Sequence, residues 1–191
     1  MGGSFNPAHD GHLLVSRLAL QRLKLDRLWW LVTPGNPLKP VEGLPALPLR
    51  IAAAQATTRD PRIAVTGFEA EIGARFTYDS IAWLKRRAPG AHFVWIMGAD
   101  NLRQFHLWRR WRDIARLVPI AVVDRPGSTL RALSSHAGAA LAPFQVAESS
   151  AAGFADRRAP AFIFLHGPRS NLSSTAIRRF GSPPHGELSL R

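Results

Sequence analysis

The residues best suited to chemistry lie in the first twelve positions, which combine two glycines, a turn and two histidines. Gly2 and Gly3 let the backbone turn tightly and approach a ligand without a Cβ in the way, and Asn6-Pro7 is a turn signal. An apolar pattern typical of a helix begins directly after His12. The first amides of a helix have no partners inside it, so a glycine-rich turn leading into a helix is a ready anion site. Because His9 and His12 flank the start of this helix, the segment indicates a site that binds phosphate.

The elements that must position this segment follow from alternating apolar runs and amphipathic stretches. Nearly continuous apolar runs are typical of buried parallel strands, and we expect strands at residues 27–33, 63–66, 92–98, 119–123 and 162–165. Apolar residues at helical spacing predict helices at residues 12–23, 49–58 and 77–84, an arginine-rich helix that closes at 113–117, and a helix start at 173–179. Thr77 is the expected N-cap of its helix. The Ala/Ser-rich residues 128–160 indicate only one imperfect helix and loops.

Strands that alternate with helices in this way predict a parallel sheet. The fold class is therefore α/β, a Rossmann-like doubly wound parallel sheet with helices on both faces, in a single domain spanning residues 1–191. The loop at residues 34–40 follows the strand at 27–33. It thus lies at the carboxyl edge, where open α/β sheets bind ligands.

Composition excludes several classes of protein. Apolar residues make up 46% of the chain and charged residues 20%, as in a soluble globular protein. The absence of cysteine excludes disulfides, thiolate metal sites and cysteine nucleophiles, and it suits the cytoplasm. We find no signal peptide and no apolar run long enough for a membrane span, so we expect no membrane partner.

The net charge of +12 comes from 25 basic residues, of which 22 are arginine. The densest group lies at residues 103–116, where five arginines are interleaved with Phe105, Trp108 and Trp111. Basic and aromatic residues together can bind single-stranded nucleic acid. These aromatic residues fall at helical spacing, however, which favours a packed helix with a solvated arginine face. A nucleotide substrate would also explain part of the positive charge.

The segment from Gly2 to His12 (Gly-Gly-Ser-Phe-Asn-Pro-Ala-His-Asp-Gly-His) resembles the H-x-G-H signature of the nucleotidyltransferase superfamily, in the form found in bacterial nicotinate-nucleotide adenylyltransferases. Later segments resemble further motifs of that family, in the family's order. They are the loop at residues 33–39, the turn at 76–78, Gly98-Ala99-Asp100 with Phe105 and Trp108, and the stretch Leu-Ser-Ser-Thr-Ala-Ile-Arg at 172–178. The resemblance covers residues 1–179.

The resemblance implies transfer of the adenylyl group of ATP to nicotinate mononucleotide, which gives nicotinate adenine dinucleotide and pyrophosphate on the route to NAD. The residues present suit this chemistry. The phosphate of the acceptor is already an anionic nucleophile at neutral pH, so the protein must align the reactants and neutralise charge rather than supply a base. Mg²⁺ carried with ATP would bridge the phosphates and need few protein ligands, so no residue is assigned to a metal.

The resemblance also implies the site residues. Those implied to bind ATP are Gly3, Ser4, Phe5, His9, His12, Gly98, Asp100, Arg125, Ser173, Ser174 and Arg178. Within this set the catalytic residues are His9, His12 and Arg178. Those implied to bind nicotinate mononucleotide are Lys39, Thr77, Tyr78 and Trp108.

Other interpretations of these residues stay open. His9, His12 and the serines at 173–174 could be only turn or helix-cap residues, and Trp108 could be a core residue rather than a stacking surface. The chain could be another nucleotidyltransferase of this fold, with nicotinamide mononucleotide or phosphopantetheine as acceptor. It could also be a catalytically inactive relative that binds nucleotides or nucleic acid through its charge, and a homo-oligomer is open.

Two departures from the family pattern stand out. The family places a β-strand immediately before the glycine pair, and here only Met1 precedes it. We therefore expect the usual first strand, central in a 3-2-1-4-5 sheet, to be missing or truncated. Residues 181–186 stop the last helix early, and the closing segment of the family is not recognisable.

Overall fold

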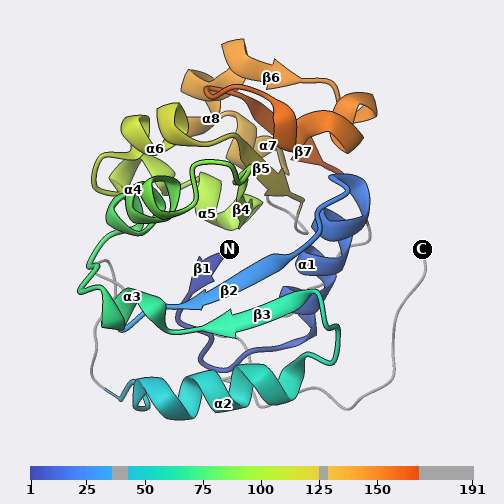
Figure 1. Ribbon diagram of the computed structural model, residues 1–191. Helices are drawn as coiled ribbons and strands as arrows, with labels where there is room; N and C mark the ends of the chain where they lie inside the picture. The colour runs from blue at the N-terminus through green and yellow to red at the C-terminus, as the bar shows by residue number, and fades with distance from the viewer. Residues whose placement is uncertain (36–42, 125–128, 168–191) are drawn as a thin grey trace.

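A computed structural model describes residues 1–35, 43–124 and 129–167 of the chain (Figure 1). Strands and helices alternate along it, as the sequence predicts. The elements, with η for 3₁₀-helices, are β1 Gly2–Gly3, α1 Asp10–Arg22, β2 Leu28–Val32, α2 Leu47–Thr57, β3 Ile63–Thr66, α3 Phe68–Glu71, α4 Thr77–Arg87, β4 Trp95–Gly98, α5 Ala99–Leu102, η1 Phe105–Leu107, α6 Trp111–Leu117, β5 Ile120–Val123, α7 Thr129–Leu133, α8 His136–Leu141, η2 Ala142–Phe144, β6 Gln145–Val146, η3 Glu148–Asp156 and β7 Phe162–Leu165.

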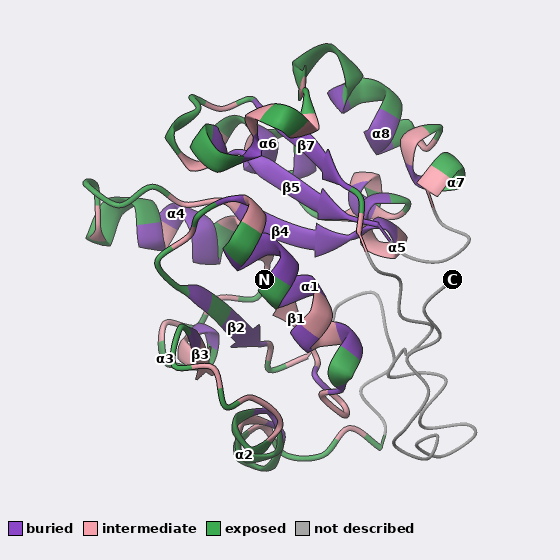
Figure 2. Cartoon of the chain, turned by 90° about the vertical axis from the view of Figure 1, so that its right-hand side faces the viewer, coloured by how far each residue is buried: buried purple, intermediate pink, exposed green. Residues whose placement is uncertain are grey.

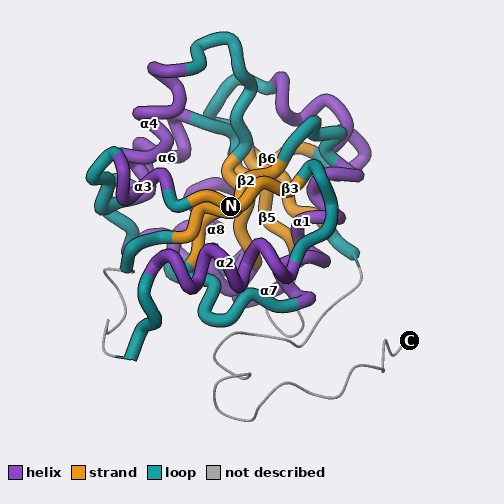
Figure 3. The backbone as a smooth tube through the Cα atoms, turned by 60° about the horizontal axis from the view of Figure 1, so that its bottom comes forward, coloured by secondary structure: helices purple, strands orange, loops and turns teal. Residues whose placement is uncertain are grey.

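The strands form two parallel sheets, one in the order β1-β2-β3 and the other in the order β4-β5-β7-β6. All the strand pairs among the described residues are parallel, and the arrows of β4, β5 and β7 point the same way in Figure 2. Figure 3 shows the strands gathered at the centre with helices around them. The expected α/β class with helices flanking a parallel sheet is thus confirmed.

Side chains that alternate along the strands fill two cores, one on each face. Ile96, Val123 and Ile163 point into the core that contains α1 and η3. Their strand neighbours Met97 and Val122 point into the other core, with residues of α4, α5, α6 and α8. Because both faces of these strands are covered, their sequences are continuously apolar. Figure 2 shows the buried strands between half-buried helices.

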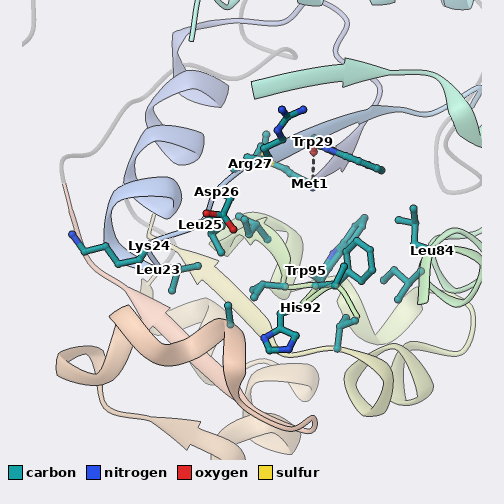
Figure 4. A pocket seen from close by; sticks show the side chains of 18 of the residues that line it. Met1, Leu23, Lys24, Leu25, Asp26, Arg27, Trp29, Leu84, His92 and Trp95 are labelled. Atoms are coloured by element: carbon teal, nitrogen blue, oxygen red, sulfur yellow. Dashed lines mark hydrogen bonds between the residues drawn. The ribbon is translucent and has the colours of Figure 1, made fainter. Parts of the chain in front are cut away.

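The first strand is short, as expected, and the expected 3-2-1-4-5 order is interrupted after it. β1 has two residues and pairs with β2, but within the described part of the chain it forms no ladder with β4. A Cβ added to Gly2 would lie 3.0 Å from the Trp95 ring, so this side chain fills part of the junction. A cavity of about 610 Å³ lies between the amino ends of β2 and β4, beside Met1, Leu28 and Val94 (Figure 4). It occupies the place where a longer first strand would run.

Three details of the predicted helices are wrong, and a fourth prediction lies outside the described residues. Residues 103–117 do not form one arginine-rich helix, because Arg110 adopts a left-handed conformation (φ 57°) between η1 and α6. Thr77 is the first residue of α4 rather than its N-cap, which is Phe76. Residues 128–160 contain two α-helices, two 3₁₀-helices and the short strand β6 among the described residues. The helix start expected at 173–179 lies outside them.

Candidate active site

The glycine turn leaves β1 at the carboxyl edge of the sheet. Gly3 accepts a hydrogen bond from the amide of Thr33 (3.0 Å), which fixes the start of the turn against the end of β2. Phe5 has a positive φ of 45°, a conformation that is uncommon for a residue with a side chain. Its ring is 1% exposed and stacks on Trp30 with 5.0 Å between centroids. The buried ring therefore anchors the turn, and only the backbone of Phe5 is placed to meet a ligand.

His9 and His12 form a reciprocal cap at the start of α1. His9 is the N-cap, and its Nδ1 accepts a hydrogen bond from the amide of Gly11 (3.1 Å). The Nδ1 of His12 in turn accepts from the amide of His9 (3.2 Å). The two ring centroids lie 3.9 Å apart. The cap role open at the sequence level is therefore present, and it involves one nitrogen of each ring.

This cap determines the tautomer of both rings. A backbone N–H can donate only to an unprotonated ring nitrogen, so the proton of each neutral imidazole resides on Nε2. Each ring thus has an N–H donor that is separate from the helix cap. Two such donors beside the first amides of a helix form a site suited to phosphate oxygens. The cap interpretation and the functional one are compatible, because they use different atoms.

Two buried side chains hold the first turn of α1 against β2. The Oγ of Ser16 donates to the carbonyl oxygen of His12 (2.8 Å) and accepts from Nε1 of Trp30 (2.7 Å). Ser16 and Trp30 are both fully buried. Breaking these bonds would leave buried polar groups without partners, which is costly. The two bonds therefore hold the backbone of His12, and with it the His12 ring, in place against β2.

Gly98 and Asp100 lie at the carboxyl end of β4, on the same edge as the glycine turn. Gly98 pairs in register with Val123, the last residue of β5, and it is the N-cap of α5. Asp100 lies in the first turn of α5 and is half-buried. β4 shares no ladder with β1 among the described residues, but α1 and β4 pack in one core. Because ligands bind at the carboxyl ends of parallel strands, we expect Gly98 and Asp100 on the same side as His9 and His12.

Thr77, Tyr78 and Trp108 lie where α4 begins beside η1. The N-cap of α4, Phe76, makes no side-chain cap hydrogen bond, so the first amides of α4 receive none from that residue. Trp108 is half-buried and meets the ring of Trp95 edge-on, with 6.2 Å between centroids. Tyr78 and Trp108 both pack against the core formed with α4, α5 and α6. These residues, expected together from the sequence, are on neighbouring elements.

Two arginines add positive charge to the start of α4. The guanidinium of Arg109 lies 4.7 Å from the ring centroid of Phe76. That of Arg110 lies 3.6 Å from the ring centroid of Tyr78 and donates from Nε to Asp113 (2.9 Å). These contacts are cation–π interactions. Arg110 also has a left-handed backbone (φ 57°), which sequence periodicity alone did not predict.

A buried carboxyl supports the same end of α4. Glu69 is 6% exposed and accepts a 2.6 Å hydrogen bond from Ser80, which ties α3 to α4. Burial raises the pKa of Glu69, and the hydrogen bond from Ser80 and the nearby Met1 ammonium oppose that rise only in part. The Met1 ammonium donates to the carbonyl of Trp29 (2.9 Å; Figure 4), and burial lowers its pKa to about 5.

Several expected site residues cannot be placed. Lys39, Arg125, Ser173, Ser174 and Arg178 lie outside the described residues. Within the segments 1–35, 43–124 and 129–167, no group of three or more His, Cys, Asp or Glu side chains is arranged to hold a metal ion. No helix in these segments is long and apolar enough to cross a membrane.

Comparison with known proteins identifies the class to which this site belongs. A profile of the cytidylyltransferase-like family matches residues 1–180, and the chain belongs to that family. Curated relatives narrow the assignment. A protein of Methylorubrum extorquens is 61% identical over 93% of this chain and 96% of its own length. One of a Bradyrhizobium species is 56% identical over 93% of each chain. Both are named "Probable nicotinate-nucleotide adenylyltransferase", so within the family the chain groups with these adenylyltransferases.

A solved structure confirms the fold. The nicotinic acid mononucleotide adenylyltransferase of Plasmodium falciparum complexed with NaAD superposes with a TM-score of 0.67, over 94% of this chain and 80% of that chain. The sequence identity is 16%, so this likeness concerns the fold.

Proposed function

We propose that this protein transfers the adenylyl group of ATP to nicotinate mononucleotide, and that His9 and His12 act on the transferring phosphate. The observation that carries the proposal is the pair of imidazoles at the start of α1, each with Nδ1 engaged in the helix cap. In the neutral form each ring therefore has its proton on Nε2; this atom is buried in His9, whereas His12 is half-buried. In this arrangement the imidazoles donate hydrogen bonds to phosphate oxygens, and neither has to act as a general base.

The reaction balances without a proton acceptor. A phosphate oxygen of the mononucleotide attacks the α-phosphorus of ATP and forms a new P–O bond. The bond from the α-phosphorus to the oxygen bridging it to the β-phosphorus breaks, and pyrophosphate leaves. The Nε2 protons of His9 and His12 stabilise negative charge on the α-phosphoryl oxygens. In this proposal Ser173, Ser174 and Arg178 hold the β- and γ-phosphates that leave as pyrophosphate, with the charge of Arg178 offsetting theirs. Arg125 lies near the ribose and adenine side of ATP.

Nucleotidyl transfer from ATP generally uses a divalent metal ion, and we propose Mg²⁺. In this proposal the metal arrives on the nucleotide, bound to the phosphates of ATP. Mg²⁺ retains water and phosphate oxygens as its main ligands and needs one or two carboxylates at most. The half-buried Asp100, in the first turn of α5 just after β4, would lie at the ribose and adenine side of ATP.

The start of α4 suits the nicotinate end of the acceptor. The first amides of α4 and the positive end of its dipole favour a carboxylate there, and the half-buried Trp108 offers an aromatic surface for the ring. Thr77 and Tyr78 would contribute the amides, and Lys39 would neutralise the acceptor phosphate. Gly98 would let the adenosine approach the backbone at the end of β4.

The test is pyrophosphate release by the purified chain with ATP, Mg²⁺ and each of three acceptors: nicotinate mononucleotide, nicotinamide mononucleotide and phosphopantetheine. We expect release that depends on the acceptor and is fastest with nicotinate mononucleotide. Release with phosphopantetheine alone would assign the chain to another branch of the family. The absence of release with all three, together with nucleic-acid binding that weakens steeply with salt, would favour an inactive binding protein instead.

A further inference from the structure

Arg50 of α2 is a buried arginine that contacts two parts of the proposed site. It is 3% exposed, whereas arginine is rarely buried in proteins unless its charge is paired. Within the described part of the chain, its side-chain hydrogen bonds all go to backbone carbonyl oxygens. Nε donates to Pro45 (2.8 Å), Nη1 to Ser4 (2.9 Å) and Thr33 (2.8 Å), and Nη2 to Pro34 (3.2 Å).

These four acceptors belong to three separate segments. Ser4 is in the glycine turn, Thr33 and Pro34 follow β2, and Pro45 precedes α2. A guanidinium has five N–H donors in a rigid planar fork, and four bonds therefore determine the relative positions of these segments closely. Hydrogen bonds to a charged group are worth more than neutral ones. Arg50 thus joins the turn after β1 to both sides of the loop that carries Lys39.

The bond to Ser4 also determines where the next amide points. In a trans peptide unit the C=O and N–H groups point in opposite directions. Since the carbonyl oxygen of Ser4 points at Arg50, the N–H of Phe5 points away from α2. Phe5 itself is held by its buried ring and its positive φ, so the peptide cannot turn over without disturbing both anchors.

We propose that Arg50 is a positioning residue for adenylyl transfer, which orients the Ser4–Phe5 peptide so that the Phe5 amide binds a phosphate oxygen of ATP. The proposal rests on the adenylyltransferase function proposed above. Arg50 itself does not touch the reactants. Its effect on ATP passes through the glycine turn. The nicotinate end of the acceptor is bound at the start of α4 in the proposed site, and Arg50 makes no hydrogen bond to that helix among the described residues.

The test compares Arg50→Lys with Arg62→Lys as a matched control. Arg50→Lys keeps the charge but loses the planar fork. Arg62 also forms a two-pronged contact, to Asp60 (Nε 3.1 Å, Nη2 2.9 Å), but on the exposed surface after α2. Affinity for a non-hydrolysable ATP analogue is measured by calorimetry, and kcat and both KM values by pyrophosphate release. Melting temperatures ensure that each variant is assayed while folded.

We expect Arg50→Lys to weaken analogue binding and to lower kcat/KM for ATP, each by at least roughly 10-fold, as for a misplaced phosphate donor. KM for the mononucleotide should change less than KM for ATP, because the nicotinate end is bound at α4 in the proposed site. Arg62→Lys should match wild type throughout. Arg50→Ala should recover activity and analogue affinity with millimolar methylguanidinium and not with methylammonium. Such a rescue would show that the guanidinium group itself is needed for ATP binding, rather than the overall stability of the fold. The rescue experiment also serves as the test if Arg50→Lys folds poorly.

The outcomes separate the two proposals. Wild-type analogue affinity in Arg50→Lys would overturn the positioning role, whether or not the chain turns over any acceptor. Equal losses for ATP and for the mononucleotide, with no rescue by methylguanidinium, would show a merely structural role and also overturn it. An analogue that binds wild type and Arg62→Lys but not Arg50→Lys supports positioning, even if failed turnover defeats the adenylyltransferase assignment.

Discussion

The start of α4 predicts a strong preference for the acid form of the acceptor, which is tested by exchanging its carboxylate for an amide. Nicotinate would place a carboxylate at helix amides that no side chain of the N-cap occupies. Nicotinamide would instead direct its NH₂ donors at those same donors. The guanidinium of Arg110, 3.6 Å from the Tyr78 ring centroid, adds positive charge to this end of α4. The amide therefore loses a charge-assisted interaction and leaves polar groups unpaired.

The magnitude follows from these two losses. Hydrogen bonds to a charged group contribute about 1.5–3 kcal/mol, and an unsatisfied buried donor costs about 1–3 kcal/mol. Solvent near the exposed rim reduces their sum, so we expect a difference of about 2–3 kcal/mol, or roughly 30- to 150-fold in kcat/KM. Stacking on Trp108 serves both rings equally and does not contribute.

The assay measures kcat/KM for both mononucleotides with ATP saturating. Arg110→Gln is a useful companion variant, because it removes a positive charge near the carboxylate and should narrow the preference. Equal efficiencies for the two acceptors in the wild type, or a preference for the amide, would refute the carboxylate site at α4. Adenylyl transfer itself would stand in that case.

Three further predictions concern the imidazoles, the cavity and the buried carboxyl. His12→Ala should lower kcat/KM at least about 100-fold while the melting temperature falls by only a few degrees, because one helix-cap bond is lost; wild-type turnover would exclude its role. Adding about five apolar, β-forming residues ahead of Met1 should fill the cavity between β2 and β4 and raise the melting temperature; an unchanged value would show that the cavity does not accept a strand. Burial raises the folded-state pKa of Glu69 above its ordinary value of 4.5. Ionisation of this carboxyl therefore destabilises the fold as the pH rises from 4.5 through the folded-state pKa. Glu69→Gln should therefore be more stable than wild type near pH 7, with the gap closing toward pH 4 in denaturant melts, and a gap that widens on acidification would contradict the burial argument.

Much of the fold could be predicted because the strands are buried on both faces. Residues 119–123 and 162–165 are apolar runs with turn residues around them, and each contains a fully buried strand of four residues. The strand β6 has two residues, one exposed, and exists through its pairing with β7. No local pattern marks such a strand. The helix predicted through residues 103–117 failed because its aromatic spacing was helical while a single left-handed residue, Arg110, divides it.

Motif spacing selects His9 and His12 as candidate site residues, and the structure places both at the start of α1. The spacing could not reveal that both Nδ1 atoms are engaged in the cap, since that depends on atomic positions. Arg50 was missed because it is one of 22 arginines. Its role depends on carbonyl oxygens of Ser4 and Thr33, which are 46 and 17 residues away in the sequence.

The central claim is that the α-phosphoryl group of ATP, with its adenosine, moves to the acceptor phosphate. It is tested most directly by incubating the chain with nicotinate mononucleotide and ATP carrying radioactive phosphorus in either the α- or the γ-position, and separating the products. We expect the α-label to appear in a dinucleotide and the γ-label in pyrophosphate, in equal amounts. A γ-label found on the mononucleotide, or an α-label that stays in mononucleotides while ATP is consumed, would contradict it.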